Sequence, residues 1–186
     1  EFAASVPFAE EGDLLLSFRE LNAIGIVNPE RQELVWATRG PWIGQHDADP
    51  LSNGNILLFD NYGDYEGERG ISRVIEFDPL TMEIVWDYGG SPEQPLDSAI
   101  RSEQQRLENG NTLIVESNRG RILEVTPEGE IAWEFINPAR GGEEEGQIAI
   151  VASAQRVQTN SLDQDFLAEL SRPAELLQKA KETTTR

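Results

Sequence analysis

The chain of 186 residues carries 34 acidic and 15 basic side chains, and its net charge of −19 predicts repulsion from nucleic-acid phosphates and anionic lipid surfaces. Nucleic acid is therefore excluded as an expected partner. No apolar run approaches the roughly 20 residues that a membrane-spanning helix needs. The length predicts one globular domain, and the lack of cysteine excludes disulfides, thiolate zinc sites and a thiol nucleophile. The first residues lack the basic and apolar regions of a signal peptide.

One pattern occurs three times along the chain, beginning with a turn that precedes a short apolar strand, at residues 11–18, 53–60 and 109–116. A second short strand and a turn with proline follow, and then a strand that contains Trp36, Trp86 or Trp133. A repeat of about 50 residues fits four antiparallel strands, as in the blades of a propeller. We therefore predict an all-β fold with a partial β-propeller of three four-stranded blades, over about residues 5–40, 42–90 and 98–138.

The second repeat shows the expected blade most clearly. Its strands are predicted near residues 46–51, 56–60, 72–78 and 83–88, and Asn53-Gly54 is expected to supply the positive φ angles of a tight hairpin. The third repeat has a tight middle turn at residues 117–120. The second repeat carries a long polar loop there, at residues 61–70, and such loops often hold binding groups.

The repeat pattern stops after Pro138. Residues 139–160 are predicted to form an acidic linker with one further strand at 147–152, and residues 161–186 a short helical tail. An apolar stripe of the tail contains Phe166, Leu167 and Leu170, then Leu176 and Leu177 beyond Pro173. A solvated amphipathic tail and a segment that docks on a partner both remain open.

His46 is the only histidine of the chain, and it is the main candidate for chemistry. As the start of an inner strand, it is expected to point toward the axial channel. A neutral imidazole nitrogen is a nucleophile at pH 7, and a carboxylate can fix its tautomer. Because neighbouring residues of a strand point to opposite faces, Asp49 is favoured over Asp47 as the orienting group.

The motifs Trp42-x-x-Gln45-His46-Asp47, Asn53-Gly54-Asn55 with the strand after it, and residues 104–114 continuing to 124–134 resemble the bacterial arylsulfotransferase family. The resemblance covers about residues 12–138, the C-terminal half of the usual domain. It implies half of a six-bladed propeller, a periplasmic or secreted location, and sulfuryl transfer from an aryl sulfate to a phenol without a nucleotide or other cofactor. It also implies that His46 is the nucleophile.

The chain departs from the family pattern in its catalytic set. The family uses further histidines and an arginine, but this chain has no second histidine, and counting back from Asn109 places Ser102 at the position of His46. Arg101 and Arg106 are the candidate substrate-binding cations, and Arg119 and Arg121 are further cations of the third repeat. The catalytic set is therefore expected to be incomplete within this chain.

Three blades cannot close a ring, because propellers have about four to eight blades. The chain is thus a part of a longer protein, one half of a homodimeric ring, or a shortened relative with a structural purpose. A homo-oligomer or a larger assembly that completes the propeller is the expected partner.

Several of these features have a second interpretation. A lone histidine is often structural, and the three tryptophans fit blade packing. His46 with Asp47 and Asp49 lacks a known metal-ligand spacing, and Asp60, Asp64 and Glu66 lack an EF-hand pattern, so no metal site is predicted. Two functions remain: an arylsulfotransferase-like enzyme, and a non-catalytic accessory or scaffold subunit that docks through open blade edges and the helical tail.

Overall fold

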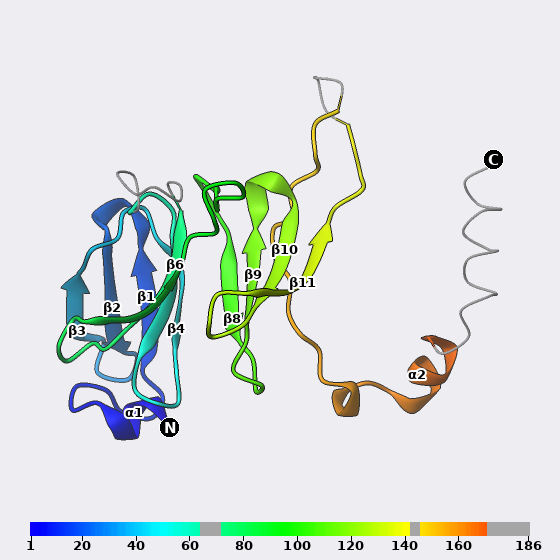
Figure 1. Ribbon diagram of the computed structural model, residues 1–186. Helices are drawn as coiled ribbons and strands as arrows, with labels where there is room; N and C mark the ends of the chain where they lie inside the picture. The colour runs from blue at the N-terminus through cyan, green and yellow to red at the C-terminus, as the bar shows by residue number, and fades with distance from the viewer. Residues whose placement is uncertain (64–71, 142–145, 171–186) are drawn as a thin grey trace. The chain divides into compact units, whose positions relative to one another are not determined.

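A computed structural model describes residues 1–63, 72–141 and 146–170 of the chain (Figure 1). It divides into two units, residues 1–155 and residues from 156 onward. Eleven strands of the first unit form three antiparallel sheets, which we call blades 1, 2 and 3. Blade 1 consists of β1 (Leu14–Phe18), β2 (Ala23–Asn28) and β3 (Glu33–Arg39); blade 2 of β4 (His46–Pro50), β5 (Ile56–Asp60), β6 (Arg73–Phe77) and β7 (Ile84–Tyr88); blade 3 of β8 (Glu103–Arg106), β9 (Thr112–Glu116), β10 (Arg121–Val125) and β11 (Ile131–Ile136).

The predicted all-β partial propeller with a C-terminal helix is confirmed, with one difference in blade 1. Blades 2 and 3 are four-stranded meanders, whereas blade 1 has three strands in the described residues, and β1 matches the second strands β5 and β9. Ahead of β1 the chain forms the short helix α1 (Phe2–Ser5) instead of an inner strand. The sequence there is rich in alanine and contains Pro7, which fits a helical turn and a loop better than a strand.

The Asn-Gly-Asn hairpins are held by a glutamate on the third strand of their blade. In blade 2, Asn53 and Asn55 each donate from their amide to Glu76 Oε1, at 2.9 and 2.6 Å. Gly54 alone has a positive φ of 91°, so the expected left-handed conformation applies to the glycine and not to Asn53. In blade 3, Asn109 and Asn111 donate in the same way to Glu124 Oε1. The spacing of the two asparagines is thus explained by their shared acceptor.

Apolar side chains fill the spaces between consecutive blades. One buried cluster joins blades 1 and 2 and includes Ile24, Trp42 and Phe77; a second joins blades 2 and 3 and includes Phe59 and Leu123. Trp36 packs against the first cluster and Trp86 against the second, as expected for blade packing. The two clusters contribute most of the stabilisation of unit 1, because each fully buried large side chain is worth about 2 kcal/mol.

Polar contacts fix blade 3 against blade 2. Arg106 of β8 forms an ion pair with Glu76 at 2.7 Å and lies 4.9 Å above the Trp86 ring. The Trp86 indole N–H donates to the carbonyl of Pro127 in the turn before β11. These contacts place the inner strand β8 beside the inner strand β4.

The segment after blade 3 contains less regular structure than the sequence predicts. At residues 147–152, where a further strand is expected, the structure has a single bridge between Ile148 and Arg140. The predicted helical tail is present as α2 (Gln164–Leu170), on which Phe166 is exposed. Pro173, Leu176 and Leu177 lie outside the described residues. No helix in the described ranges is long and apolar enough to cross a membrane.

Candidate functional site

The residues before His46 anchor the start of blade 2 on blade 1. The Trp42 indole donates to the carbonyl of Asn22, and the Gly44 N–H donates to the Asn22 side chain at 2.8 Å. The buried Gln45 amide donates to the carbonyl of Ala23 and to Ser17 Oγ. Trp42 and Gln45 of the motif therefore have a positioning role: they hold the backbone so that His46 occupies the first position of the inner strand β4.

His46 is partly buried, and its ring contacts Asn61, which follows the neighbouring strand β5. The distance between His46 Nδ1 and Asn61 Oδ1 is 2.7 Å. The orientation of the Asn61 amide follows from its other contacts, because its NH₂ group donates to the carbonyls of Ser98 at 2.6 Å and Arg101 at 2.9 Å. An amide oxygen is an acceptor, so His46 Nδ1 must carry the proton. In the neutral form of the ring, His46 Nε2 then carries the lone pair.

Backbone strain accompanies this arrangement. Arg101 and Ser102 have positive φ angles of 62° and 73°, although neither is glycine, and the carbonyl of Arg101 is one of the two acceptors of Asn61. Asp47, next to His46, has a φ of 52°. Non-glycine residues in this conformation cost about 1 kcal/mol or more each, and they concentrate at functional sites.

A bulge in β4 changes the residue correspondence expected from counting. His46 pairs with Phe59 and Asp49 with Leu57, so Asp47 and Ala48 together oppose one residue of β5. In blade 3, Glu103 pairs with Val115, which occupies the place of Phe59. The counterpart of His46 is therefore Glu103 and not Ser102, because counting along the sequence misses the residue inserted by the bulge.

The bulge also turns Asp47 toward the next inner strand. Asp47 Oδ2 accepts from the Gln104 backbone N–H at 3.0 Å and from the Gln104 amide at 3.2 Å. Burial, and then the charge of Glu103, raise the pKa of Asp47, and the hydrogen bond from the Gln104 N–H acts against this rise. The alternation rule that disfavoured Asp47 does not hold across a bulge.

Asp49 lies in a crowded acidic environment. Burial, and then the neighbouring charges of Asp47 and Glu103, raise its pKa to about 7, while a hydrogen bond from Gln104 acts in the opposite direction. The orienting contact predicted for Asp49 is made by Asn61, since Nδ1 of His46 is occupied by the Asn61 side chain.

The buried carboxylate of Asp60 closes the other side of the site. It accepts from the N–H groups of Ile43 and Gly63 and forms an ion pair with Arg73 at 3.0 Å. Burial raises its pKa against the lowering effect of these donors. The bond from Ile43 holds the segment before His46, and Arg73 also donates to the carbonyl of Pro41 in that segment, so Asp60 is committed to positioning. Asp64 and Glu66 lie outside the described residues, and no group of acidic, histidine or cysteine side chains fit for a metal exists in the described ranges.

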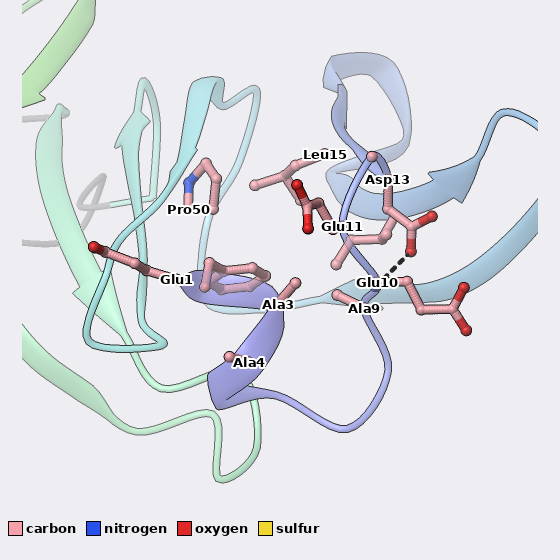
Figure 2. Close-up of a pocket in the computed structure, with 12 residues that line it drawn as sticks. Glu1, Ala3, Ala4, Ala9, Glu10, Glu11, Asp13, Leu15 and Pro50 are labelled. Atoms are coloured by element: carbon pink, nitrogen blue, oxygen red, sulfur yellow. Dashed lines mark hydrogen bonds between the residues drawn. The ribbon is translucent and has the colours of Figure 1, made fainter.

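A cavity of about 530 Å³ lies elsewhere, between the N-terminal residues and the hairpin end of blades 1 and 2 (Figure 2). Its walls include Phe2 of α1, Leu15 of β1 and Pro50, which is at the opposite end of β4 from His46. Glu10 and Glu11 give it an acidic rim. It is not part of the His46 site.

The sequence model described as Arylsulfotransferase (ASST) matches residues 3–138 of the chain, which are the three blades. The chain belongs to the arylsulfotransferase family. No curated protein sequence matches it.

Solved structures place the family fold of this chain among propellers. The WD40 propeller domain of Doa1 aligns with a TM-score of 0.50 at 14% identity, over 69% of this chain and 38% of that chain. A streptogramin B lyase aligns with 0.48 at 17% identity, over 70% and 39%, and virginiamycin B lyase from Staphylococcus aureus with 0.46 at 16%, over 70% and 40%. The chain thus spans about two fifths of the length of these proteins, and the similarity concerns the fold alone.

The arginines that the sequence offered as candidates lie in different places in the structure. The main chain of Arg101 is part of the His46 site, and its exposed guanidinium makes no hydrogen bond or ion pair in the described residues. Arg106 lies at the hairpin end of β8, bound to Glu76. Arg119 and Arg121 are bound to the buried Glu116.

Arg19 and Asn61 were not singled out by the sequence. A Cβ on Gly44 would lie 3.7 Å from Arg19 Nη2, which places this guanidinium beside the segment that delivers His46. Arg19 Nε is buried and has no hydrogen-bond partner among the described residues. Both residues directly follow the apolar strand of their repeat, and this shared position after β1 and β5 is the signal that could have revealed them.

Proposed function

We propose that this chain of the arylsulfotransferase family carries a sulfuryl-transfer site with His46 as the nucleophile. The observation that carries the proposal is the contact between His46 Nδ1 and Asn61 Oδ1, together with the two carbonyls that orient the Asn61 amide. A neutral histidine with Nδ1 protonated keeps its Nε2 lone pair for attack. This is the form that nucleophilic catalysis needs, and it requires no cofactor.

The reaction proceeds in two transfers. In the first, the Nε2 lone pair of His46 forms a bond to the sulfur of an aryl sulfate, the sulfur–oxygen bond to the ring breaks, and the phenolate leaves and takes a proton from solvent. In the second, the oxygen of an acceptor phenol attacks the same sulfur, its proton passes to solvent, and the nitrogen–sulfur bond breaks. Asn61 keeps the ring oriented in both steps by accepting from Nδ1.

Donors near the sulfur are required, because the transferred group spreads negative charge over its oxygens. Arg19 and Arg101 are the proposed cations, because Arg19 lies beside Gly44 and the carbonyl of Arg101 accepts from Asn61. The buried Nε–H of Arg19 has no partner in the described part of the chain, and buried donors without a partner are rare in folded proteins. The Nη1 group of Arg19 is paired with the exposed Glu20, so a sulfuryl oxygen would compete with that carboxylate for the guanidinium.

The proposed ligands are an aryl sulfate and a phenol, and the proposed location is the periplasm or the exterior of the cell, where the family is typically found. The chain itself supplies one histidine, so the other histidines used by the family must come from outside this sequence. The proposed enzyme is therefore an assembly in which further blades complete the channel around His46.

Mass spectrometry of the His46 peptide after incubation with 4-nitrophenyl sulfate tests the proposal. The expected result is a peptide heavier by one SO₃ group, formed in the wild type and absent in His46→Ala. Trp42, Gln45 and Asp60 hold the backbone independently of the imidazole, so His46→Ala is expected to fold. Nitrophenol release that is equal in both proteins, without a modified peptide, would refute the proposal.

The second candidate function is a non-catalytic accessory or scaffold subunit. The observation that favours it is the exposure of the outer strand β11, where Trp133 is 47% exposed and Phe135 is 40% exposed. Exposed aromatic side chains of this kind mark interaction surfaces. A chain that never forms the His46 adduct, but loses a bound protein neighbour in Trp133→Ser, would support this candidate over the enzyme.

A further inference from the structure

Two asparagines of the chain precede a glycine, Asn53 and Asn109, and each lies in the hairpin that follows the inner strand of its blade. This dipeptide is chemically unstable, because glycine has no Cβ and its backbone nitrogen can reach the side-chain carbonyl carbon of the asparagine. The nitrogen forms a bond to that carbon, its proton leaves with the NH₂ group as ammonia, and a succinimide ring closes. Water then opens the ring, which leaves aspartate or isoaspartate in place of asparagine.

The hairpin of blade 2 holds both reacting groups in hydrogen bonds. The Gly54 N–H donates to the carbonyl of Leu51 at 3.0 Å, so the nitrogen that would attack has its proton engaged. Asn53 Oδ1 accepts from the N–H of Asn55 at 3.0 Å, and the Asn53 NH₂ group donates to Glu76 Oε1 at 2.9 Å. Because the reaction expels this NH₂ group, it cannot proceed without loss of the bond to Glu76.

The hairpin of blade 3 has the same arrangement with a longer contact to its glutamate. The Gly110 N–H donates to the carbonyl of Leu107 at 3.0 Å, and Asn109 Oδ1 accepts from the N–H of Asn111 at 3.1 Å. The Asn109 NH₂ group, however, lies 3.3 Å from Glu124 Oε1. The bond that the reaction must break is therefore weaker in blade 3 than in blade 2.

The two hairpins also differ in what covers the glycine. A Cβ on Gly54 would lie 2.8 Å from the Cβ of Ser5, the last residue of α1, so the helix packs directly on this turn. Gly54 is buried, whereas Gly110 is partly exposed, and a Cβ on Gly110 would have its nearest contact with Pro127, at 3.8 Å. Closure of the succinimide ring moves the backbone at the glycine, and packing opposes this movement more strongly in blade 2.

We propose that Asn53 and Asn109 are sites of spontaneous deamidation, and that Glu76 and Glu124 restrain the reaction by holding the two side-chain amides. Asn109 converts before Asn53, because its contact with the glutamate is longer and its glycine is less covered. The Asn-Gly-Asn hairpins are thus modification sites, and the glutamate on the third strand of each blade sets the rate of the modification.

The modification acts on the joint between blades 2 and 3. A carboxylate at position 53 would face Glu76 Oε1, and two carboxylates in contact repel each other. Glu76 also forms the ion pair with Arg106 of blade 3 at 2.7 Å. Conversion of Asn53 therefore disturbs the hairpin at the point where blade 3 is attached, whereas conversion of Asn109 acts on Glu124 within blade 3.

The second asparagine of each hairpin is an internal control. Asn55 and Asn111 donate to the same two glutamates, but they precede Ile56 and Thr112 instead of glycine. A β-branched side chain hinders the approach of the backbone nitrogen. These two asparagines are therefore expected to stay unmodified under conditions that convert their neighbours.

The first measurement is peptide mass spectrometry of the folded chain during incubation in a mildly alkaline buffer, with the chain in guanidinium chloride as the reference. Both Asn-Gly sites are expected to convert at similar rates in the unfolded chain. In the folded chain both should be slower, Asn109 should convert before Asn53, and isoaspartate should be present as the mark of the succinimide. Equal rates in the folded and unfolded chain, no conversion in either, or conversion of Asn53 before Asn109 would overturn the proposal.

The second measurement compares Glu76→Ala with Glu124→Ala, and each variant is the matched control of the other. Glu76→Ala is expected to raise the conversion rate at Asn53 roughly tenfold or more, the factor that one hydrogen bond to a charged group is worth, and to change the rate at Asn109 far less. Glu124→Ala should do the reverse. Equal rises at both asparagines would show general opening of the chain, and an unchanged rate beside the replaced glutamate would show that it restrains nothing; either result would overturn the role of the glutamates.

Discussion

Asn61 Oδ1 accepts a hydrogen bond from His46 Nδ1 at 2.7 Å, and two backbone carbonyls fix the direction of the Asn61 amide. The pair links the ends of two neighbouring strands, β4 and β5, with the strained turn at Arg101 and Ser102. The direction of the Asn61 amide thus determines that Nδ1 of the His46 ring carries a proton.

Asn61→Leu is expected to reduce sulfuryl transfer by roughly 10²-fold or more, because the imidazole then loses both its orientation and its fixed tautomer. It also leaves the carbonyls of Ser98 and Arg101 without their donor, which costs about 1–3 kcal/mol of stability. Nitrogen NMR of the His46 ring separates the two effects, since the Nδ1-protonated form should dominate in the wild type only. Ser72→Ala is the control: Ser72 Oγ bonds to the backbone of Asn61 and of Ser98 but to neither the Asn61 amide nor His46, so this variant should lose stability with an unchanged ring spectrum.

Asp49→Asn is expected to flatten the pH dependence of stability between about pH 4 and pH 7. The folded-state pKa of about 7 lies above the unfolded value of 3.8, so the folded chain holds a proton that the unfolded chain releases in this window. Stability from this group is therefore fully present at low pH and is lost as the pH rises through 7. Thermal unfolding across pH 4 to 8 measures it, with the exposed Glu93→Gln as the control. A wild-type melting temperature that rises steadily over this range, unchanged in Asp49→Asn, would contradict the assignment.

Glu76→Gln is expected to destabilise blade 2 and its contact with blade 3 together, because Glu76 accepts from Asn53 and Asn55 and pairs with Arg106. Replacing the carboxylate leaves a partly buried guanidinium without its counter-ion, and breaking such pairs costs about 3 kcal/mol or more. Denaturant unfolding measures the loss. Glu83→Gln, on an exposed position ahead of β7, should change stability by less than about 0.5 kcal/mol. Equal stability of the two variants would show that the hairpin does not depend on Glu76.

The repeat pattern predicted the blades well, because turn residues and tryptophans report local chain geometry. Eleven strands appear where the three repeats place them, and β4 to β7 match their expected bounds within one or two residues. Blade 1 has three strands in the described residues where about four are expected, and the turn-and-strand pattern alone does not show this difference, because β1 pairs with β2 whether or not its other edge is occupied.

The site was less predictable than the fold. The sequence singles out His46 as the candidate, but the contact of its ring is made by Asn61, which is 15 positions away, and the bulge at Asp47 changes the register of the strand. In so short a strand, a bulge cannot be recognised from the sequence pattern. The alternation of side chains along a regular strand therefore favoured Asp49 over Asp47. Arg19 was missed for a related reason, since its closeness to the His46 segment arises from the packing of blade 1 on blade 2.

Arg19→Gln is expected to lower kcat/KM for aryl sulfates by roughly 10²- to 10³-fold, the usual effect of removing one donor that stabilises transition-state charge. Arg19→Lys keeps the positive charge but lacks the planar set of guanidinium donors, so it should recover only part of the rate. Arg31→Gln is the control, because Arg31 pairs with Glu10 and Glu33 at the surface of blade 1. The steady-state rates with 4-nitrophenyl sulfate, measured beside the yield of the His46 adduct, locate the effect. A full rate with a normal adduct in Arg19→Gln would assign Arg19 to the packing of Gly44 alone, and Arg101 would then remain as the cation of the site.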